Sequence, residues 1–333
     1  IEVEIEDPVA CPRYSGVTLK NLQVAPSPDW LQNKLKAIGV RPINNIVDIT
    51  NYVLFETGQP LHAFDADAIS GGKVIVKKLA EGTAFVTLDE VERKLGANDL
   101  MICNTEAPMC MGGVFGGLHS GVTENTTSIF LESACFDAKT IRKTARLHGL
   151  QTDASFRFER GSDPEITVYA LKRAILLMQE LAGGEVASEI KDAYPGKIDT
   201  VEVELSFQYV NKIAGQLIEP EVVVSILQDL GFEVLNKNET TALLRVPTYK
   251  VDVYRQVDLV EEVLRIYGYD KIVIPEKLNA SINISERINP DKLQHDIADM
   301  LCAMGLQEIM NNSLTKSAYT SNHKAFEASS NVA

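Results

Sequence analysis

Cysteine is scarce in this sequence, and long apolar runs are missing from it. Its 333 residues include five cysteines, at positions 11, 103, 110, 135 and 302, and no two of them have C-x-x-C spacing. We therefore expect reduced thiols in a cytosolic (cytoplasmic) protein, and neither a zinc site nor a disulfide scaffold. No apolar stretch approaches the length of a membrane span and no signal peptide opens the chain, so we expect no membrane association.

Positive charge is also in short supply. Lys and Arg number 32 against 46 Asp and Glu, which gives a net charge of −14. A chain this acidic does not bind nucleic acid through its overall charge, so we expect no DNA partner, and any contact with RNA must come from a local basic patch. The glycine-rich string MGGVFGG at 111–117 lacks the Lys-Ser/Thr ending of a phosphate loop and predicts a tight turn between strands.

The pattern of apolar residues predicts an α+β, multi-domain protein. Alternating residues in 1–24 and 73–132 indicate strands, and helical spacing is found at about 29–38, 45–57, 137–148 and 163–182. We expect three domains: a β-rich domain at 1–195, a small α+β domain at 198–275, and the start of a further domain at 286–333 with a strand-like segment at 306–314. Because the chain starts at Ile1 and stops in a polar run, we expect a segment of a longer protein.

The stretch 41–65 is a candidate site, because it reads as a helix followed by a polar elbow. Gly58 ends the helix, Pro60 prevents its return, and His62 is expected in the loop that follows. Imidazole titrates near neutrality, so a histidine held there suits chemistry. The stretch by itself favours the simpler alternative, a histidine that caps a turn or lies in the core.

Two further stretches indicate a pocket. Glu132 follows a mostly apolar run, so it is expected near a core or cavity, where it needs a hydrogen-bond partner. The polar loop at 152–154, Thr-Asp-Ala, has the small side chains of a pocket wall.

Two charged clusters have alternative interpretations. Residues 139–160 include six basic and two acidic residues, a local net charge of +4. Four of the six basic residues share one helix face: Lys139, Arg142, Lys143 and Arg146. They are either a solvated face or a contact for phosphates. Four carboxylates lie within eleven residues, at Asp252, Asp258, Glu261 and Glu262. They suit Mg²⁺ or Ca²⁺, although their spacing alone favours the solvated face of an amphipathic helix.

Five separated strings resemble one family, in that family's order. They are INNIVDITNYVLFETGQPLHAFD, MGGVFGG, IFLESACFD, HGLQTDASFRFERGSDP and YKVDVYRQVDLVEEVLRIYGYD. Together they are similar to the beta chain of phenylalanyl-tRNA synthetase over roughly residues 1–314. The resemblance implies that the first domain is an editing domain, which hydrolyses mischarged tyrosyl-tRNA, and that 286–333 begins a class II-synthetase-like domain that is cut short.

The resemblance also implies roles for individual residues. Glu132 would accept a hydrogen bond from the tyrosine hydroxyl, and His62 would lie near the ester, either as a general base or to orient water. Thr152 and Ala154 would form the pocket wall, with Gly116 lining it and Thr50 and Asn51 near the aminoacyl group. The basic face would contact tRNA(Phe). The four carboxylates would fall on magnesium positions near the alpha chain.

Partners follow from the same resemblance. An alpha chain is expected, with two alpha and two beta chains in the full enzyme, and ATP would be used only through the alpha chain. Relative to the family, a tRNA-binding module before this segment and the anticodon-binding end would be missing, so we expect editing and no aminoacylation from the segment alone. The other class that stays open is a non-catalytic scaffold that docks tRNA or another subunit.

Overall fold

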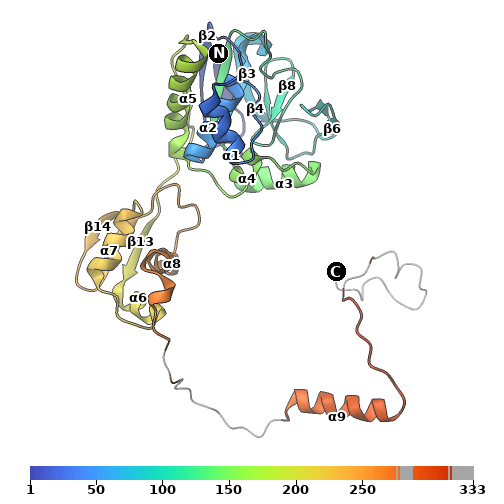
Figure 1. Cartoon of the computed structure of the whole chain (residues 1–333), viewed down its shortest axis with the longest axis vertical. Coiled ribbons are helices and arrows are strands. Elements are labelled where there is room, and N and C mark those ends of the chain that lie inside the picture. The colour runs from blue at the N-terminus through green and yellow to red at the C-terminus, as the bar shows by residue number, and fades with distance from the viewer. Residues whose placement is uncertain (275–276, 278–287, 314–315, 317–333) are drawn as a thin grey trace. The chain divides into compact units, whose positions relative to one another are not determined.

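The computed structural model describes residues 1–274, 277, 288–313 and 316. The chain forms two compact units, Ile1–Val273 and Ile274–Ala333, each considered by itself. Figure 1 shows the elements of the first unit in chain order. No helix in the described part of the chain is both long and apolar enough to cross a membrane.

The first 195 residues hold two five-stranded sheets and a β-hairpin. One sheet has the order β1-β4-β7-β8-β9, and the other has β11-β2-β10-β3 with β12 also paired to β2. The strands are β1 (Glu2–Ile5), β2 (Arg13–Lys20), β3 (Leu61–Asp65), β4 (Lys73–Lys78), β5 (Ala84–Val86), β6 (Glu92–Lys94), β7 (Leu100–Cys103), β8 (Pro108–Met111), β9 (Phe115–Gly116), β10 (Ile129–Cys135), β11 (Glu185–Val186) and β12 (Lys191–Ala193). The predicted turn at 111–117 lies between β8 and β9, as expected.

Five α-helices accompany these sheets: α1 (Asp29–Ala37), α2 (Asn45–Thr57), α3 (Ala138–His148), α4 (Asp153–Phe158) and α5 (Thr167–Ala182). Their ends follow local chemistry. The Asn44 side chain accepts a hydrogen bond from the Val47 amide at the start of α2, and Gly58 ends that helix with φ +79°. Asp137 begins α3 in the same way, through the Thr140 amide. These helix predictions are confirmed.

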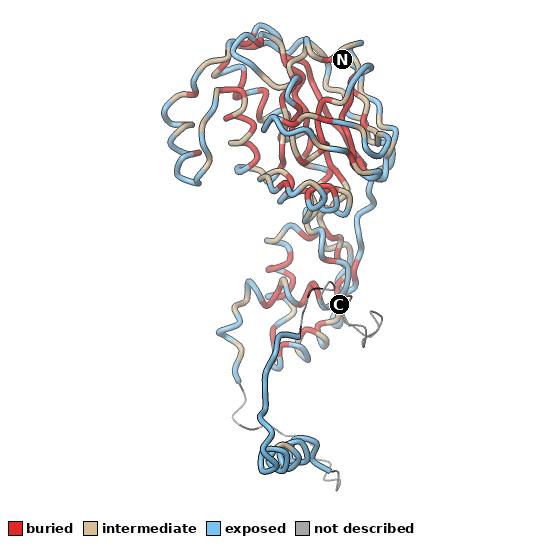
Figure 2. The backbone as a smooth tube through the Cα atoms, turned by 90° about the vertical axis from the view of Figure 1, so that its right-hand side faces the viewer, coloured by how far each residue is buried: buried red, intermediate tan, exposed pale blue. Residues whose placement is uncertain are grey.

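Strand β10 is the centre of the fold, and all seven of its residues are buried. Its even-numbered face packs toward the first sheet, with Phe130 in a cluster that includes Tyr14 and Phe64. Its odd-numbered face carries Ile129 and Leu131 into a second cluster beneath α1, α2 and α5. The alternation of a strand thus divides the core into two layers, and Figure 2 shows the buried backbone concentrated in these strands.

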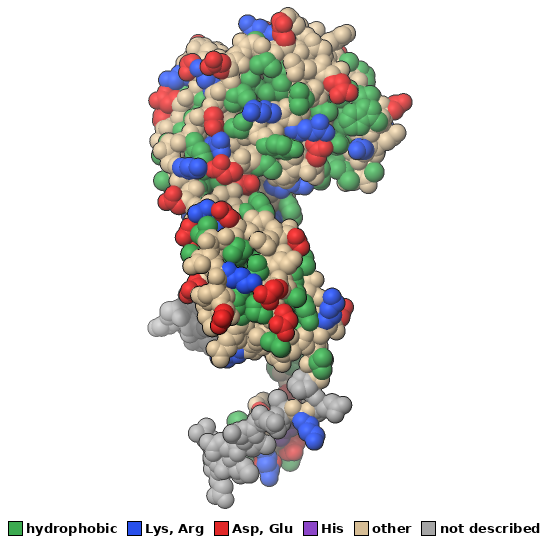
Figure 3. All heavy atoms as spheres, turned by 90° about the vertical axis from the view of Figure 1, so that its left-hand side faces the viewer, with side chains coloured by type: hydrophobic (Ala, Val, Ile, Leu, Met, Phe, Trp, Pro, Cys, Tyr) green, Lys and Arg blue, Asp and Glu red, His purple; other side chains and the backbone are tan. Residues whose placement is uncertain are grey.

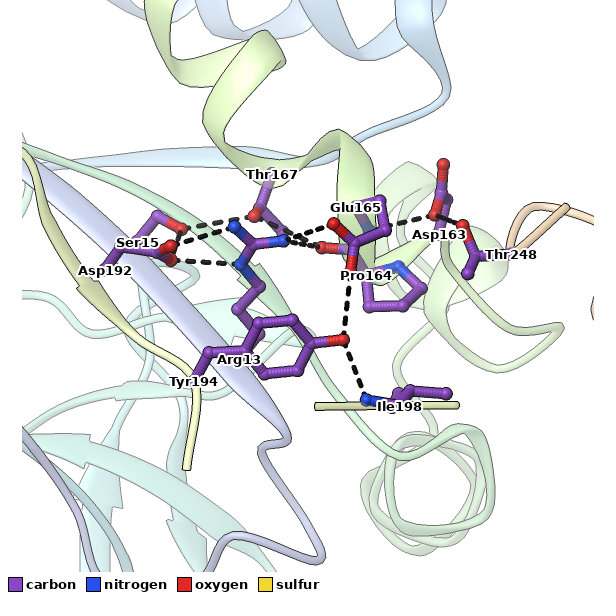
Figure 4. Close-up of polar contacts among 10 residues, drawn as sticks. All are labelled: Arg13, Ser15, Asp163, Pro164, Glu165, Thr167, Asp192, Tyr194, Ile198 and Thr248. Carbon is purple, nitrogen blue, oxygen red and sulfur yellow. Dashed lines mark hydrogen bonds and ion pairs between the residues drawn. The ribbon is translucent and has the colours of Figure 1, made fainter. Parts of the chain in front are cut away.

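Arg13 fixes the segment that leaves this domain (Figure 4). Its guanidinium binds both carboxylate oxygens of Asp192, at 3.0 and 2.8 Å, and donates to the Pro164 carbonyl at 2.8 Å. It lies 4.6 Å from the Tyr194 ring centre, and that phenol donates to Glu165 at 3.2 Å. A two-point, planar contact of this kind is specific to arginine, so the cluster holds β12 and the following chain against β2.

The remainder of the first unit is a three-stranded antiparallel sheet, β13-β15-β14, covered by helices. Its elements are β13 (Glu202–Ser206), α6 (Phe207–Ala214), α7 (Pro220–Asp229), β14 (Glu233–Lys237), β15 (Thr241–Arg245) and α8 (Gln256–Tyr267). A core of its own includes Leu205, Leu227, Leu244 and Val263. On the face drawn in Figure 3, acidic and basic side chains alternate without a field of one sign.

Three local predictions are wrong. His62 lies within β3 and not in a loop, because its segment pairs with β10, a partner far away in the sequence. Thr152 caps a short helix and Ala154 belongs to that helix, α4, so the stretch is not a loop. In the second unit, α9 (Pro290–Ala303) is present as expected, but residues 306–313 form no strand, because no described strand of that unit is there to pair with them. Residue 314 lies outside the described residues.

Candidate functional site

A cavity of about 340 Å³ opens beside β10 and is bounded by α2, β3, the β8–β9 turn and α4. Its lining includes every residue predicted for the pocket: Thr50, Asn51, His62, Gly116, Glu132, Thr152 and Ala154. The volume lies in the range of small-molecule sites. Residues from five separate stretches of the sequence therefore meet around one space.

Glu132 is the buried acid of this cavity. Its side chain comes from the middle of β10 and the residue is only 5% exposed. The Tyr14 hydroxyl donates to its Oε2 at 2.6 Å. Burial raises the pKa of Glu132 to about 7, although the hydrogen bond from Tyr14 works in the opposite direction. Oε1 has no hydrogen bond within the described part of the chain, so it is the oxygen available to a ligand.

His62 is the partner of Glu132 in the register between β3 and β10. Its ring stands edge-on to Phe64, with 4.4 Å between the ring centres. Its Nε2 is buried and has no hydrogen-bond partner among the described residues. Burial lowers the pKa of His62 to about 4, so the imidazole is neutral at physiological pH.

Gly116 and Thr152 shape the wall of the cavity. A Cβ added at Gly116 would lie 2.7 Å from Cδ1 of Leu88, the end of an exposed side chain, and 3.3 Å from Cε1 of His62, so a larger residue here would displace Leu88 and crowd the imidazole. The Thr152 hydroxyl donates to the Val114 carbonyl at 3.0 Å and accepts from the Ser155 amide at 3.0 Å. These bonds join the start of α4 to the β8–β9 turn.

Helix α2 supplies the polar residues at the other side. The Thr50 hydroxyl is used within the helix, where it donates to the Val47 carbonyl at 2.7 Å. The Asn51 side chain makes no hydrogen bond to the described residues. Its amide can therefore both donate to and accept from a ligand.

The basic face predicted on α3 is exposed and lies outside the cavity lining. Arg142 donates to the Glu159 carbonyl at 2.7 Å, which ties α3 to α4. In the described ranges none of its four basic side chains has a carboxylate within ion-pair distance. They are Lys139, Arg142, Lys143 and Arg146.

The four carboxylates predicted to hold magnesium do not converge. Asp258 binds the Arg255 guanidinium at 2.9 Å and two backbone amides at the start of α8. Glu262 is bound by Lys250 at 2.5 Å and by Arg265 at 2.8 Å. Asp252 and Glu261 are exposed, and the described residues contain no group of three such side chains placed to hold a metal. In this arrangement the four side chains do not fit a magnesium ion. The magnesium site therefore remains a prediction from the resemblance alone.

Sequence reasoning missed Tyr14, Leu88, Cys110 and Phe158. The last three also line the cavity. Tyr14 stands on the same face of β2 as Gly16, which lies opposite Glu132, so its contact depends on strand pairing and carries no local signal. Nothing local shows which strand would pair with it.

Comparison with known proteins identifies two domains in the chain. Residues 10–183 match the B3/4 domain, and residues 203–269 match the tRNA synthetase B5 domain. Because the first match covers just over half of the chain, the chain belongs to the B3/4 domain family. Within that class it is similar to phenylalanine–tRNA ligase beta subunits, so the resemblance predicted from the sequence is confirmed.

The beta subunit of Bacteroides thetaiotaomicron is 55% identical over 320 residues, which cover 96% of this chain and 39% of that protein. The beta subunit of Porphyromonas gingivalis is 52% identical over 321 residues, again 96% of this chain and 39% of that protein. The chain thus spans about two fifths of the length of these curated relatives. A solved N-terminal fragment of the phenylalanyl-tRNA synthetase beta subunit from Pyrococcus horikoshii aligns with a TM-score of 0.38 at 16% identity, over 80% of this chain and 75% of that one, which is too distant to support an argument.

Proposed function

We propose that the cavity binds the aminoacyl ester at the end of a charged tRNA and hydrolyses it when the amino acid is tyrosine. The observation that supports this most directly is the free Oε1 of Glu132. This oxygen has no hydrogen bond among the described residues and is not among their buried unpartnered atoms, so it is open to the cavity. A ligand that covers it without donating a hydrogen bond leaves it unpaired, which is costly, and a ligand hydroxyl that donates to it avoids that cost.

The selectivity follows from the same atom. A pocket shaped for phenylalanine rejects an analogue with one extra hydroxyl by only about a hundredfold. A second site that is built around a hydroxyl acceptor works in the other direction, because a phenylalanyl ester would leave Oε1 unpaired and desolvated. Correct product therefore escapes and tyrosyl ester is retained.

The chemistry we propose is direct attack of water on the ester carbonyl. The described lining contains no serine, and burial raises the pKa of the one thiol, Cys110, well above its usual range. Neither residue type therefore supplies an activated nucleophile here.

His62 orients the attacking water in this proposal. Its Nε2 is buried, whereas its Nδ1 is not among the buried atoms and makes no hydrogen bond among the described residues, so Nδ1 is the ring nitrogen that a water can reach. A hydrogen bond from the water to Nδ1 fixes a lone pair of the water toward the carbonyl. A histidine with a pKa of about 4 is a weak base, so positioning contributes more than proton abstraction. The general-base role, the other role that the resemblance implies, predicts a rate that falls below the pKa of His62.

Binding of stable analogues tests the site without turnover. Adenosine that carries tyrosine or phenylalanine through a 3′-amide in place of the ester is titrated into the chain by calorimetry. We expect the tyrosyl compound to bind at least about tenfold more tightly, and Glu132→Gln to remove most of the difference. Glu180→Gln, an exposed glutamate on α5, is the matched control. Equal binding of both compounds by the wild-type chain would reject the proposal.

The larger assembly is part of the same proposal. As a segment of a beta subunit, the chain would act with an alpha chain, two of each, in a cytoplasmic phenylalanine–tRNA ligase that uses ATP through the alpha chain. Magnesium near the alpha-chain contact would require Asp258 and Glu262 to release the cations that now bind them. The class II-like character of 286–333 belongs to this proposal as well.

The second candidate is a scaffold that docks tRNA without catalysis. The unpaired basic face of α3 favours it, because four exposed cations in an acidic chain are placed to meet phosphates. The two functions are compatible, since the basic face lies outside the cavity lining.

A further inference from the structure

We infer that Tyr14 is a positioning and specificity-determining residue of this site: its hydroxyl holds Glu132 in one orientation and leaves a single carboxylate oxygen for the ligand. This inference rests on the proposed function, because it names how the selective carboxylate is prepared. Tyr14 is absent from the cavity lining and acts only through Glu132.

The strand register explains the contact. Gly16 lies opposite Glu132 in the pairing of β2 with β10, and Tyr14 lies opposite Ala134. Tyr14 is thus the diagonal neighbour of Glu132 on the same face, within reach of a long side chain. Gly16 leaves the intervening space to the Phe130 ring, since a Cβ there would be 2.2 Å from Cζ of Phe130.

The phenol has no freedom to bind elsewhere. Tyr14 is fully buried, in the cluster formed by the two sheets, and its one hydrogen bond in the described structure is the bond to Oε2 at 2.6 Å. Glutamate alone has three side-chain torsions, so an unheld carboxylate would occupy several orientations. The bond from Tyr14 selects the one that turns Oε1 to the cavity, before any ligand arrives.

The bond also affects ionisation. A phenol that donates to the carboxylate favours its charged form, which is the form that accepts best from a tyrosyl hydroxyl. The other titratable groups facing Glu132 are Cys11 before β2, Cys110 on β8 and His62 on β3. Burial holds both thiols neutral and the imidazole neutral, so Tyr14 is the only one of these groups that stabilises the anion by hydrogen bonding.

Tyr14→Phe is the direct test, with Tyr52→Phe as the matched control. Tyr52 also donates to a carboxylate, that of Glu56 at 3.2 Å, but it lies outside the cavity lining. Ester hydrolysis is measured with tyrosyl- and phenylalanyl-tRNA across the pH range around neutrality, in the two-chain ligase. The Glu132 carboxyl is titrated by ¹³C NMR in the 333-residue chain, with Glu132→Gln to assign its signal.

For Tyr14→Phe we expect a loss of tyrosyl selectivity of about tenfold and a tyrosyl rate that rises only at higher pH than in wild type. We expect the NMR midpoint of Glu132 to move upward, and Tyr14→Phe to cost nothing further in a Glu132→Gln background. Tyr52→Phe should match wild type in tyrosyl selectivity, in the pH dependence of the tyrosyl rate and in the NMR midpoint of Glu132.

Other outcomes separate the two proposals. An unchanged NMR midpoint, or a selectivity loss that adds fully to that of Glu132→Gln, would overturn the role of Tyr14. If Tyr14→Phe raises the NMR midpoint of Glu132 but the wild-type ligase shows no preference for tyrosyl-tRNA, the contact stands and the proposed function is rejected instead. A misfolded Tyr14→Phe chain, detected by its NMR spectrum, is replaced by Tyr14→fluorotyrosine, whose more acidic hydroxyl should lower the midpoint; no change would overturn the inference.

Discussion

Glu132 and His62 face each other directly across β10 and β3, and both side chains line the same cavity. Burial moves their pKa values in opposite directions, to about 7 for the acid and about 4 for the imidazole. Each shift disfavours the charged form, so neither residue gains from ionisation of the other. Near neutral pH the imidazole is neutral, and the carboxyl, with a pKa of about 7, is present in both its neutral and its charged form. The pair is thus a polar site at the boundary of a hydrophobic core, and its carboxylate form accepts hydrogen bonds.

Glu132→Gln should change the pH dependence of stability in a defined direction. Below about pH 4.5 the carboxyl is protonated in both states, and as pH rises toward about 7 the unfolded chain ionises first, so wild type loses stability. The shift corresponds to about 3 kcal/mol. The stability of Glu132→Gln relative to wild type, from urea unfolding, should therefore increase as pH rises through this range. A constant difference would contradict the buried, raised acid.

His62→Gln should show the opposite trend. The folded protein keeps His62 neutral down to about pH 4, whereas the unfolded chain protonates near 6.5. Wild type thus has the full contribution above 6.5 and loses it as pH falls toward 4, and the variant does not. The same unfolding series measures this. The stability of His62→Gln relative to wild type should therefore increase as pH falls from 6.5 toward 4. If this relative stability does not change on acidification, the imidazole is solvated.

How far the sequence could predict this site depends on whether a feature is local. Asn44 and Gly58 mark the ends of α2 through contacts within a few residues, and both ends were predictable. The strand around His62 was not, because it exists only through its pairing with β10. Tyr14 was missed for the same reason: its diagonal contact with Glu132 depends on strand register. Placement of the pocket residues came from family resemblance, and periodicity alone gave only a buried acid that needed a partner.

Gly16→Ala tests the packing behind Glu132. The new methyl would meet the Phe130 ring at 2.2 Å, in a core with no space to yield. We expect a loss of about 1–3 kcal/mol in the free energy of unfolding. Gly196→Ala is the control, since nothing lies within 4 Å of its added Cβ. Equal stability of the two variants in urea would mean that Phe130 moves freely.

The basic face of α3 should contribute to tRNA binding through phosphates. Replacing its four cations by glutamine should weaken binding uniformly among tRNAs. It should also reduce the slope of log K against log salt by roughly 0.9 for each phosphate that the variant no longer neutralises. The residues changed are Lys139, Arg142, Lys143 and Arg146.

A charge-matched control separates this from the effect of net charge. Four exposed lysines on other elements are replaced by glutamine instead: Lys36, Lys94, Lys172 and Lys212. Binding is measured by fluorescence anisotropy over a salt series. If both quadruple variants show the same reduction in slope, α3 has no specific contact with RNA and its basic face is a solvated surface.

The most direct test of the central claim is hydrolysis of tyrosyl-tRNA against phenylalanyl-tRNA by wild type and Glu132→Ala. The account predicts selective release of tyrosine by wild type. In the variant the free carboxylate oxygen is gone, so the preference for tyrosyl-tRNA should fall, by up to about a hundredfold. The chain is assayed alone and within the complete two-chain ligase. Selective release that is unchanged in Glu132→Ala, or no tyrosyl preference in the complete wild-type ligase, would contradict it.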